Sequence, residues 1–103
     1  MTAAPRLRIK DGSIYLDAAV YERYFRRIQS IAVVLREQRI LLLPLRTLGS
    51  GGSIVKLRNA RGDRVIHARE FLRGLDLDDP EERELEAEWD PELTALSVPN
   101  PKA

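Results

Sequence analysis

Cysteine is absent from the 103 residues of this chain, which excludes disulfides, thiolate metal sites and a thiol nucleophile. The longest uninterrupted apolar runs, residues 31–35 and 40–45, are far shorter than the roughly 20 residues that cross a bilayer. The first residues lack the charged and apolar stretches of a secretory signal. We therefore expect a cytoplasmic protein that does not enter a membrane.

Charge is distributed unevenly along the chain. Residues 1–75 hold fifteen Lys or Arg and six acids, a net charge of +9, whereas residues 76–103 hold ten acids and two bases, a net charge of −8. The sequence thus predicts a basic body (1–75) and an acidic C-terminal segment (76–103). A basic surface attracts nucleic acid phosphates. A GC-rich coding sequence also favours arginine, so composition alone leaves both explanations open.

Hydrophobic patterning predicts an α+β fold, with a small, mainly antiparallel sheet and two short helices. Apolar residues at helical spacing predict an amphipathic helix over residues 18–28 after the N-cap Asp17, and residues 69–75 predict one or two helical turns. Alternating or β-branched apolar residues on either side of polar turns predict three hairpins, at residues 7–16, 31–45 and 54–68.

The C-terminal segment carries a helix-start signal. Asp79 is suited to the N-cap and Pro80 to the first helical position, with Glu82 placed as in a capping box. The sequence predicts a helix over residues 80–89, with Leu85 and Trp89 as an apolar stripe that contacts a partner. A disordered tail is predicted from Ser97 onward.

A weak internal repeat occurs at an offset of 50 residues. Each copy predicts a strand, a glycine turn, a strand and a helix, and five positions are identical: Leu7/Leu57, Arg8/Arg58, Gly12/Gly62, Ala18/Ala68 and Arg23/Arg73. A tandem hairpin and helix duplication explains these identities, and so does the common strand-turn-helix pattern.

Candidate catalytic and metal-binding residues are few. His67 is the only histidine, and no serine or cysteine stands at a spacing that suggests a nucleophile for it. Asp76, Asp78 and Asp79 lack the glycine and the terminal glutamate of a calcium loop. We therefore predict no catalytic residues, no metal site, no cofactor and no enzyme activity.

Basic residues are the best candidates for a binding surface. Arg23, Arg26 and Arg27 fall on one face of the predicted first helix, and Arg8 and Lys10 lie on the first predicted strand. Such a group is typical of a phosphate-binding surface. A solvated helix and strand face accounts for the same residues, so both interpretations stay open.

Residues 7–45 resemble the swapped-hairpin domain of AbrB and MraZ type transcription regulators. The resemblance rests on Gly12-Ser13-Ile14-Tyr15-Leu16-Asp17, then a short helix and two strands around a polar turn. Ser13 stands where the family usually has Arg, and Asp17 where it usually has Pro. The resemblance implies an intertwined homodimer or ring that contacts DNA, with Arg8, Lys10 and Arg23 as the contacting residues.

Two function classes follow from these observations. The first is a DNA-binding transcriptional regulator that uses the basic body. The second is an accessory or adaptor protein that binds another protein through its sheet or its acidic segment. We also expect a homodimer, because a body of about 75 residues buries a small share of its surface, and because residues 40–43 are apolar at successive positions.

Overall fold

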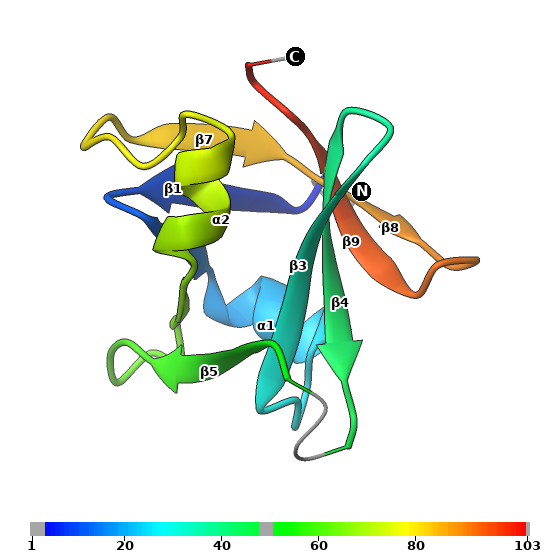
Figure 1. The fold of residues 1–103 in the computed structure, drawn as a ribbon. Helices are drawn as coiled ribbons and strands as arrows, with labels where there is room; N and C mark the ends of the chain where they lie inside the picture. The colour runs from blue at the N-terminus through cyan, green and yellow to red at the C-terminus, as the bar shows by residue number, and fades with distance from the viewer. Residues whose placement is uncertain (1–3, 48–50, 103) are drawn as a thin grey trace.

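The structure is a computed structural model that describes residues 4–47 and 51–102. Its helices are α1 (Ala18–Tyr24) and α2 (Arg69–Gly74). Nine strands lie in the described residues (Figure 1): β1 (Arg6–Lys10), β2 (Ser13–Leu16), β3 (Ser30–Arg36), β4 (Arg39–Leu45), β5 (Ser53–Leu57), β6 (Arg64–His67), β7 (Arg83–Glu86), β8 (Glu88–Asp90) and β9 (Ala95–Pro99).

The strands form one sheet in the order β7-β1-β2-β6-β5-β3-β4-β9-β8, and every pairing in it is antiparallel. β5 turns the corner between two half-sheets, because residues 55–57 pair with β6 and residues 53–54 pair with β3. β7 and β8 are consecutive segments of the chain, yet they lie at the two ends of the strand order. The sheet is therefore curled into a nearly closed barrel.

The predicted α+β class is wrong, because the protein is a nearly closed, mainly antiparallel barrel-like sheet. Its helices have seven and six residues and are too short to form a layer. The order of strands also differs from a typical swapped hairpin. The physical reason is that residues 83–99 add three strands to the sheet rather than a helix and a tail.

The helix predicted over residues 80–89 is replaced by β7 and β8. Acids at residues 84, 86 and 88 are exposed, while Leu85, Ala87 and Trp89 alternate with them and are buried or half-buried. This period of two is the strand pattern. Pairing with β1 satisfies the backbone of β7, and the Ala87 N–H donates to the Pro5 carbonyl at 2.8 Å. An isolated helix would have buried only one narrow stripe.

The disordered tail predicted from Ser97 is also wrong for the residues described. β9 pairs with β4 on one side and with β8 on the other. Leu96 and Val98 are fully buried, so this strand lines the core. Ala103 lies outside the described residues.

Arg83 anchors the turn that leads into β7. Its guanidinium donates to both carboxylate oxygens of Asp79, at 2.8 and 3.1 Å, and to Glu81 at 3.0 Å. The Arg83 hydrogen bonds lower the pKa of Asp79, and the same contacts raise the pKa of Arg83. The residues that suggested a helix start thus form an ion-paired turn.

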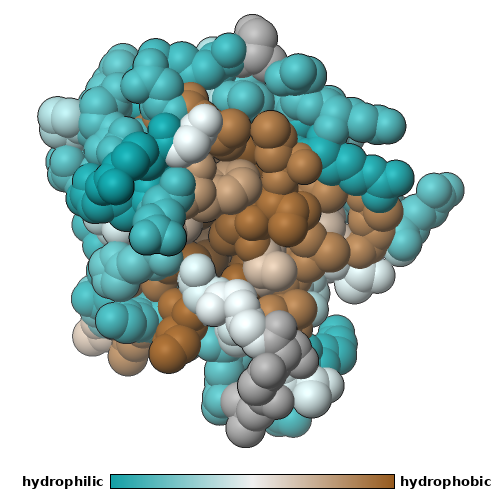
Figure 2. Space-filling view, in the orientation of Figure 1, coloured by the Kyte–Doolittle hydropathy of each residue, from teal (hydrophilic) through white to brown (hydrophobic). Residues whose placement is uncertain are grey.

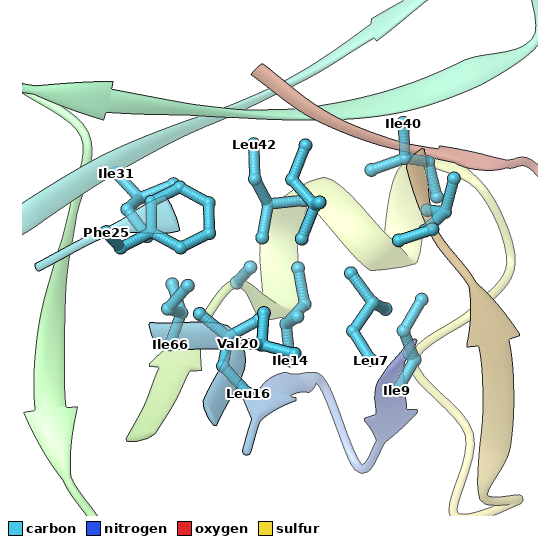
Figure 3. Packing of buried hydrophobic residues seen from close by; sticks show 14 of the residues in the cluster. Leu7, Ile9, Ile14, Leu16, Val20, Phe25, Ile31, Ile40, Leu42 and Ile66 are labelled. Atoms are coloured by element: carbon cyan, nitrogen blue, oxygen red, sulfur yellow. The ribbon is translucent and has the colours of Figure 1, made fainter. Parts of the chain in front are cut away.

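The core fills the space inside the curled sheet. Side chains from β1, β2, α1, β3, β4 and β6 point toward one another in Figure 3. The two halves of the chain meet where Ile14 of β2 pairs with Ile66 of β6, and both are fully buried. Phe25 after α1 and Leu72 of α2 are also fully buried, so each helix contributes to one core.

Strand pairings in the two halves of the chain correspond to one another. In this correspondence β1 and β2 match β5 and β6, β3 matches β7 and β8 together, and β4 matches β9. The β1–β2 hairpin thus corresponds to β5–β6, the β1–β7 pair to β5–β3, and the β3–β4 pair to β8–β9. β2–β6 and β4–β9 join the halves. The topology therefore has an approximate two-fold symmetry.

The N-terminus of α1 is capped by a residue from the other half of the chain. Asp17 occupies the N-cap position but makes no side-chain cap hydrogen bond. Instead Oδ1 of the buried Asp63 accepts the Ala18 N–H at 2.9 Å. The hydrogen bond from Asn59 and then that from Ala18 lower the pKa of Asp63. The Asp63 carboxylate thus ties the β5–β6 turn to α1.

The substitution Asp63→Ala should lower the melting temperature at pH 7, because it removes the acceptor for Ala18. The folded pKa of Asp63 lies below its unfolded value of about 3.9, so its contribution is present above pH 4 and is lost as the pH falls through the folded pKa. Thermal unfolding at pH 7 and pH 3 should show a smaller difference from wild type at pH 3. Asp17→Ala is the control, with little effect expected, and a pH-independent Asp63 effect would contradict the assignment.

Ending the chain at Leu75 should prevent folding. The truncation removes Leu77, Leu96 and Val98, each fully buried, and losing one such side chain to alanine typically costs about 2–5 kcal/mol. Far-ultraviolet circular dichroism should lose the strand signal of the full chain. A folded product would show that β7–β9 are dispensable.

Candidate functional site

A mixed basic and aromatic surface covers the outside of the first half-sheet. Leu7 and Ile9 are buried, so the alternate β1 residues, Arg8 and Lys10, lie on the outer face. Tyr15 lies directly opposite Arg8 in register. The same alternation in β5 puts Lys56 and the following Arg58 on this face, since Val55 pairs with buried Ile66. We call this surface the Tyr15 face: Arg8, Lys10, Tyr15, Lys56 and Arg58.

The Tyr15 ring is the centre of this face. The guanidinium carbon of Arg58 lies 4.7 Å from the ring centroid and that of Arg8 lies 5.9 Å from it, within the range of a cation–π interaction. The two arginines come from β1 and from the residue after β5, the two equivalent strands of the symmetric topology. The structure therefore brings together residues 50 positions apart.

Two of the five predicted nucleic-acid contacts, Arg8 and Lys10, lie on the Tyr15 face. Sequence reasoning missed Tyr15, Lys56 and Arg58 as site residues. The internal repeat contained the signal for one of them, because it aligns Arg8 with Arg58. Assigning both residues to one surface requires the pairing of β2 with β6, which no local pattern reveals.

Acidic residues of β7, of the turn before it and of the junction between β2 and α1 neutralise the arginines on one side of this face. Glu84 accepts a hydrogen bond from Arg6 at 3.0 Å, and this contact raises the pKa of Arg6. Arg8 lies 3.7 Å from both Asp17 and Glu82. Within residues 4–47 and 51–102, the three other cations of the face have no ion-pair partner within 4 Å: Lys10, Lys56 and Arg58.

The other three predicted contacts belong to α1 and the turn after it. Arg23 lies over the Tyr24 ring, with its guanidinium carbon 5.2 Å from the centroid. Arg26 forms an exposed ion pair with Glu22 at 3.5 Å. Arg27 is exposed in the following turn, with a φ of 65°. Arg23 lines a pocket with Arg6 and Asp17 at the margin of the Tyr15 face. The helix predicted to reach residue 28 ends at Tyr24, so Arg26 and Arg27 follow α1 and do not share a helix face with Arg23.

Leu85 and Trp89, the predicted partner-binding pair, are half-buried against the core cluster. The Trp89 ring stacks on Tyr24, with centroids 5.1 Å apart and an interplanar angle of 18°. It also meets Phe25 edge-on at 6.4 Å. Both side chains pack against the core from β7 and β8, and the Trp89–Tyr24 contact links β8 to α1.

His67 has a serine partner that the sequence spacing did not indicate. Ser13 Oγ and His67 Nδ1 are 2.9 Å apart, and the two residues are direct cross-strand neighbours. Ser13 is only 6% exposed. The contact is therefore a cross-strand hydrogen bond within the sheet, and the Ser13 hydroxyl is not open to a substrate. No group of three metal-ligating side chains was found in the part of the chain that the structure describes.

A second surface feature is a groove of about 500 Å³ beside β3. We call it the β3 groove; its lining includes Ala32 and Val33 of β3 and Phe71 of α2. Figure 2 shows hydrophobic residues gathered in the middle of this face, and in Figure 1 the same region lies over β3 and beside α2. The protein thus presents a basic surface and an apolar one.

Comparison with protein-family models, with curated proteins and with solved structures gives no match for this chain. The resemblance to AbrB and MraZ type regulators therefore stays a hypothesis from sequence. No helix among residues 4–47 and 51–102 is both long and apolar enough to cross a membrane.

Proposed function

We propose that this protein is a small non-enzymatic DNA-binding protein that acts as a transcriptional regulator and contacts DNA through the Tyr15 face. The observation that carries the proposal is the placement of Lys10, Lys56 and Arg58 around Tyr15, without carboxylate partners in the described structure. Cations that are not neutralised internally bind phosphates by releasing counterions.

The parts of this face have separate roles in the proposal. Lys10 and Lys56 are exposed strand residues that neutralise phosphates as mobile point charges. Arg58 offers a planar guanidinium that pairs with phosphate oxygens. Tyr15 holds Arg58 in place by the cation–π contact at 4.7 Å. Arg8 contributes less, because Asp17 and Glu82 already compete for it.

The adaptor function is the second candidate, and the apolar residues exposed around β3 favour it. The two functions respond differently to salt. Binding through phosphates weakens steeply as salt rises, whereas contact through buried apolar surface persists when charges are screened.

Replacing Lys10, Lys56 and Arg58 together with alanine should flatten the salt dependence of DNA binding. Each phosphate contact contributes about −0.9 to the slope of log K against log salt, so losing three contacts should reduce the slope by up to about 2.7. Fluorescence anisotropy of a labelled duplex, titrated at about 50 and 150 mM salt, measures the change. Circular dichroism should confirm that the variant folds, because all three side chains are exposed.

The matched control replaces Arg23, Arg26 and Arg27, which removes the same charge from α1 and the turn after it. We expect this control to keep the wild-type slope apart from a small long-range effect. Equal losses in the two triple variants would mean that binding follows net charge and not the Tyr15 face. If the wild-type protein fails to bind duplex DNA at about 50 mM salt, the DNA-binding proposal is rejected and the adaptor function becomes the better one.

A further inference from the structure

The C-terminal part of β3 has an edge that no strand of the described chain covers. β4 pairs with β3 along its whole length, whereas β5 pairs with it only at Ser30 and Ile31. The backbone that leads into β5 turns at Gly51 and Gly52, whose φ angles of 88° and 83° are in the left-handed region. Residues 32–36 consequently form an open edge, next to the β3 groove.

The hairpin register shows which backbone groups point to this edge. β3 and β4 are joined by the two-residue turn Glu37-Gln38, in which both φ angles are positive, 51° and 66°. Hydrogen-bonded pairs begin beside such a turn and alternate along the strands, so Val34 bonds to β4. Val33 and Leu35 instead direct their N–H and C=O groups to the open edge.

The exposed side chains of β3 beside this edge are apolar, while the adjoining groove is also lined by the polar residues His67, Arg69 and Glu70. Val34 is 40% exposed, Leu35 is 44% exposed and the neighbouring Ile54 is 67% exposed. Arg36, at the end of the strand, is the one charged residue of β3. An open backbone edge of this composition pairs readily with another strand. What covers it must be an extended chain, since only that satisfies alternate N–H and C=O groups.

The strand at residues 83–90 provides a contrast. Its outward residues are Glu84, Glu86 and Glu88, so two copies of this strand would repel each other. Charges of this kind are how natural sheets prevent edge pairing. β3 has no acid along its length, and its sequence lacks this protection.

We propose that the β3 edge pairs with the β3 edge of a second copy of this chain, antiparallel about a two-fold axis at Val34. In this register Val33 of one protomer lies opposite Leu35 of its partner, and each such pair exchanges both N–H···O=C bonds. The two Val34 side chains face each other across the axis. The pairing is isologous, so it closes at a dimer and covers the β3 edge of both protomers.

A second copy supplies an extended strand with the same exposed apolar residues, and charge does not oppose it in this register. Arg36 of each protomer lies opposite Ala32 of its partner, so the two Arg36 residues are four positions apart along the strand, or about 13 Å. That distance exceeds the screening length of about 8 Å at physiological salt. The same arrangement puts the exposed Val34 and Leu35 of both copies next to each other, where each covers apolar surface of the other.

Sedimentation equilibrium of the full chain tests the association. The expected mass at micromolar concentration is twice 11.7 kDa. Leu35→Lys places a charge on the edge and should raise the dimer dissociation constant at least tenfold. The control Leu57→Lys makes the same change at a leucine that is 61% exposed on β5, and it should leave the dissociation constant unchanged.

A single engineered cysteine tests the register, since the chain has no other cysteine. Directly opposed residues of a non-hydrogen-bonded pair have Cβ atoms about 4.5–5.5 Å apart, close enough for a disulfide after small adjustment. Under mild oxidation at low micromolar concentration, Val34→Cys should yield a covalent dimer. Leu57→Cys, the control, should stay monomeric.

Two results would overturn the proposal: a mass of 11.7 kDa at every concentration up to about 100 μM, or no faster cross-linking of Val34→Cys than of Leu57→Cys. The first result would remove a second copy as the occupant of the edge. The inference does not rest on DNA binding, because β3 and the Tyr15 face share no residue, and either can fail without the other.

Discussion

Closure of the barrel depends on residues 83–90, because this segment hydrogen-bonds to a strand of each half-sheet. β7 pairs with β1, and after Ala87 the chain changes partners, so that β8 pairs with β9. Ala87 is 3% exposed, so its side chain is buried where the chain passes between the two half-sheets. Without this segment β1 would have a bare edge, and the inner faces of both half-sheets would be open to water.

The position of the same segment also determines which acidic and basic residues come into contact. Strand alternation sends Leu85, Ala87 and Trp89 inward and the intervening acids outward. Because β7 lies beside β1, the acid at position 84 meets Arg6, and Glu82 lies near Arg8. Acids of the C-terminal segment and basic residues of β1 are thus brought into contact along one seam. Three cations of this half-sheet have no ion-pair partner within 4 Å among the described residues: Lys10 at the end of β1, and Lys56 and Arg58 at β5.

Local sequence patterns predicted the hairpins and the start of α1, because their determinants are close in the chain. Asp11-Gly12 forms the β1–β2 turn, and the aliphatic runs of β3 and β4 pair around their polar turn. The C-terminal strands were missed because the capping signal at Asp79 and Pro80 outweighed the alternation of residues 84–90. That alternation is stable only as part of a sheet, and its partner β1 lies more than 70 residues earlier.

The candidate site was predictable only in part, for a related reason. Arg8 and Lys10 could be placed on one strand face from the alternation of β1 alone. Lys56 and Arg58 reach the same surface through β2 and β6, and the register Tyr15 with Val65 that aligns them is a long-range property. Helical spacing grouped Arg23, Arg26 and Arg27 on one face, but α1 ends at Tyr24, so the last two arginines lie beyond the helix.

The burial of the β4 side chains shows which part of the expected dimer interface is already covered within one chain. Ile40 and Leu42 enter the core, while Leu41 points outward and is nevertheless only 4% exposed. Leu41 lines a hollow of about 580 Å³ with Trp89 and Leu93, so the β8–β9 hairpin shelters it. In the β3–β4 hairpin, the apolar surface that still faces water belongs to β3. β5 does not cover it, because β5 pairs with β3 only at Ser30 and Ile31. The surface that we propose for dimerisation is therefore the edge of β3 and not the face of β4. At that edge, backbone N–H and C=O groups give direction to the hydrophobic contact.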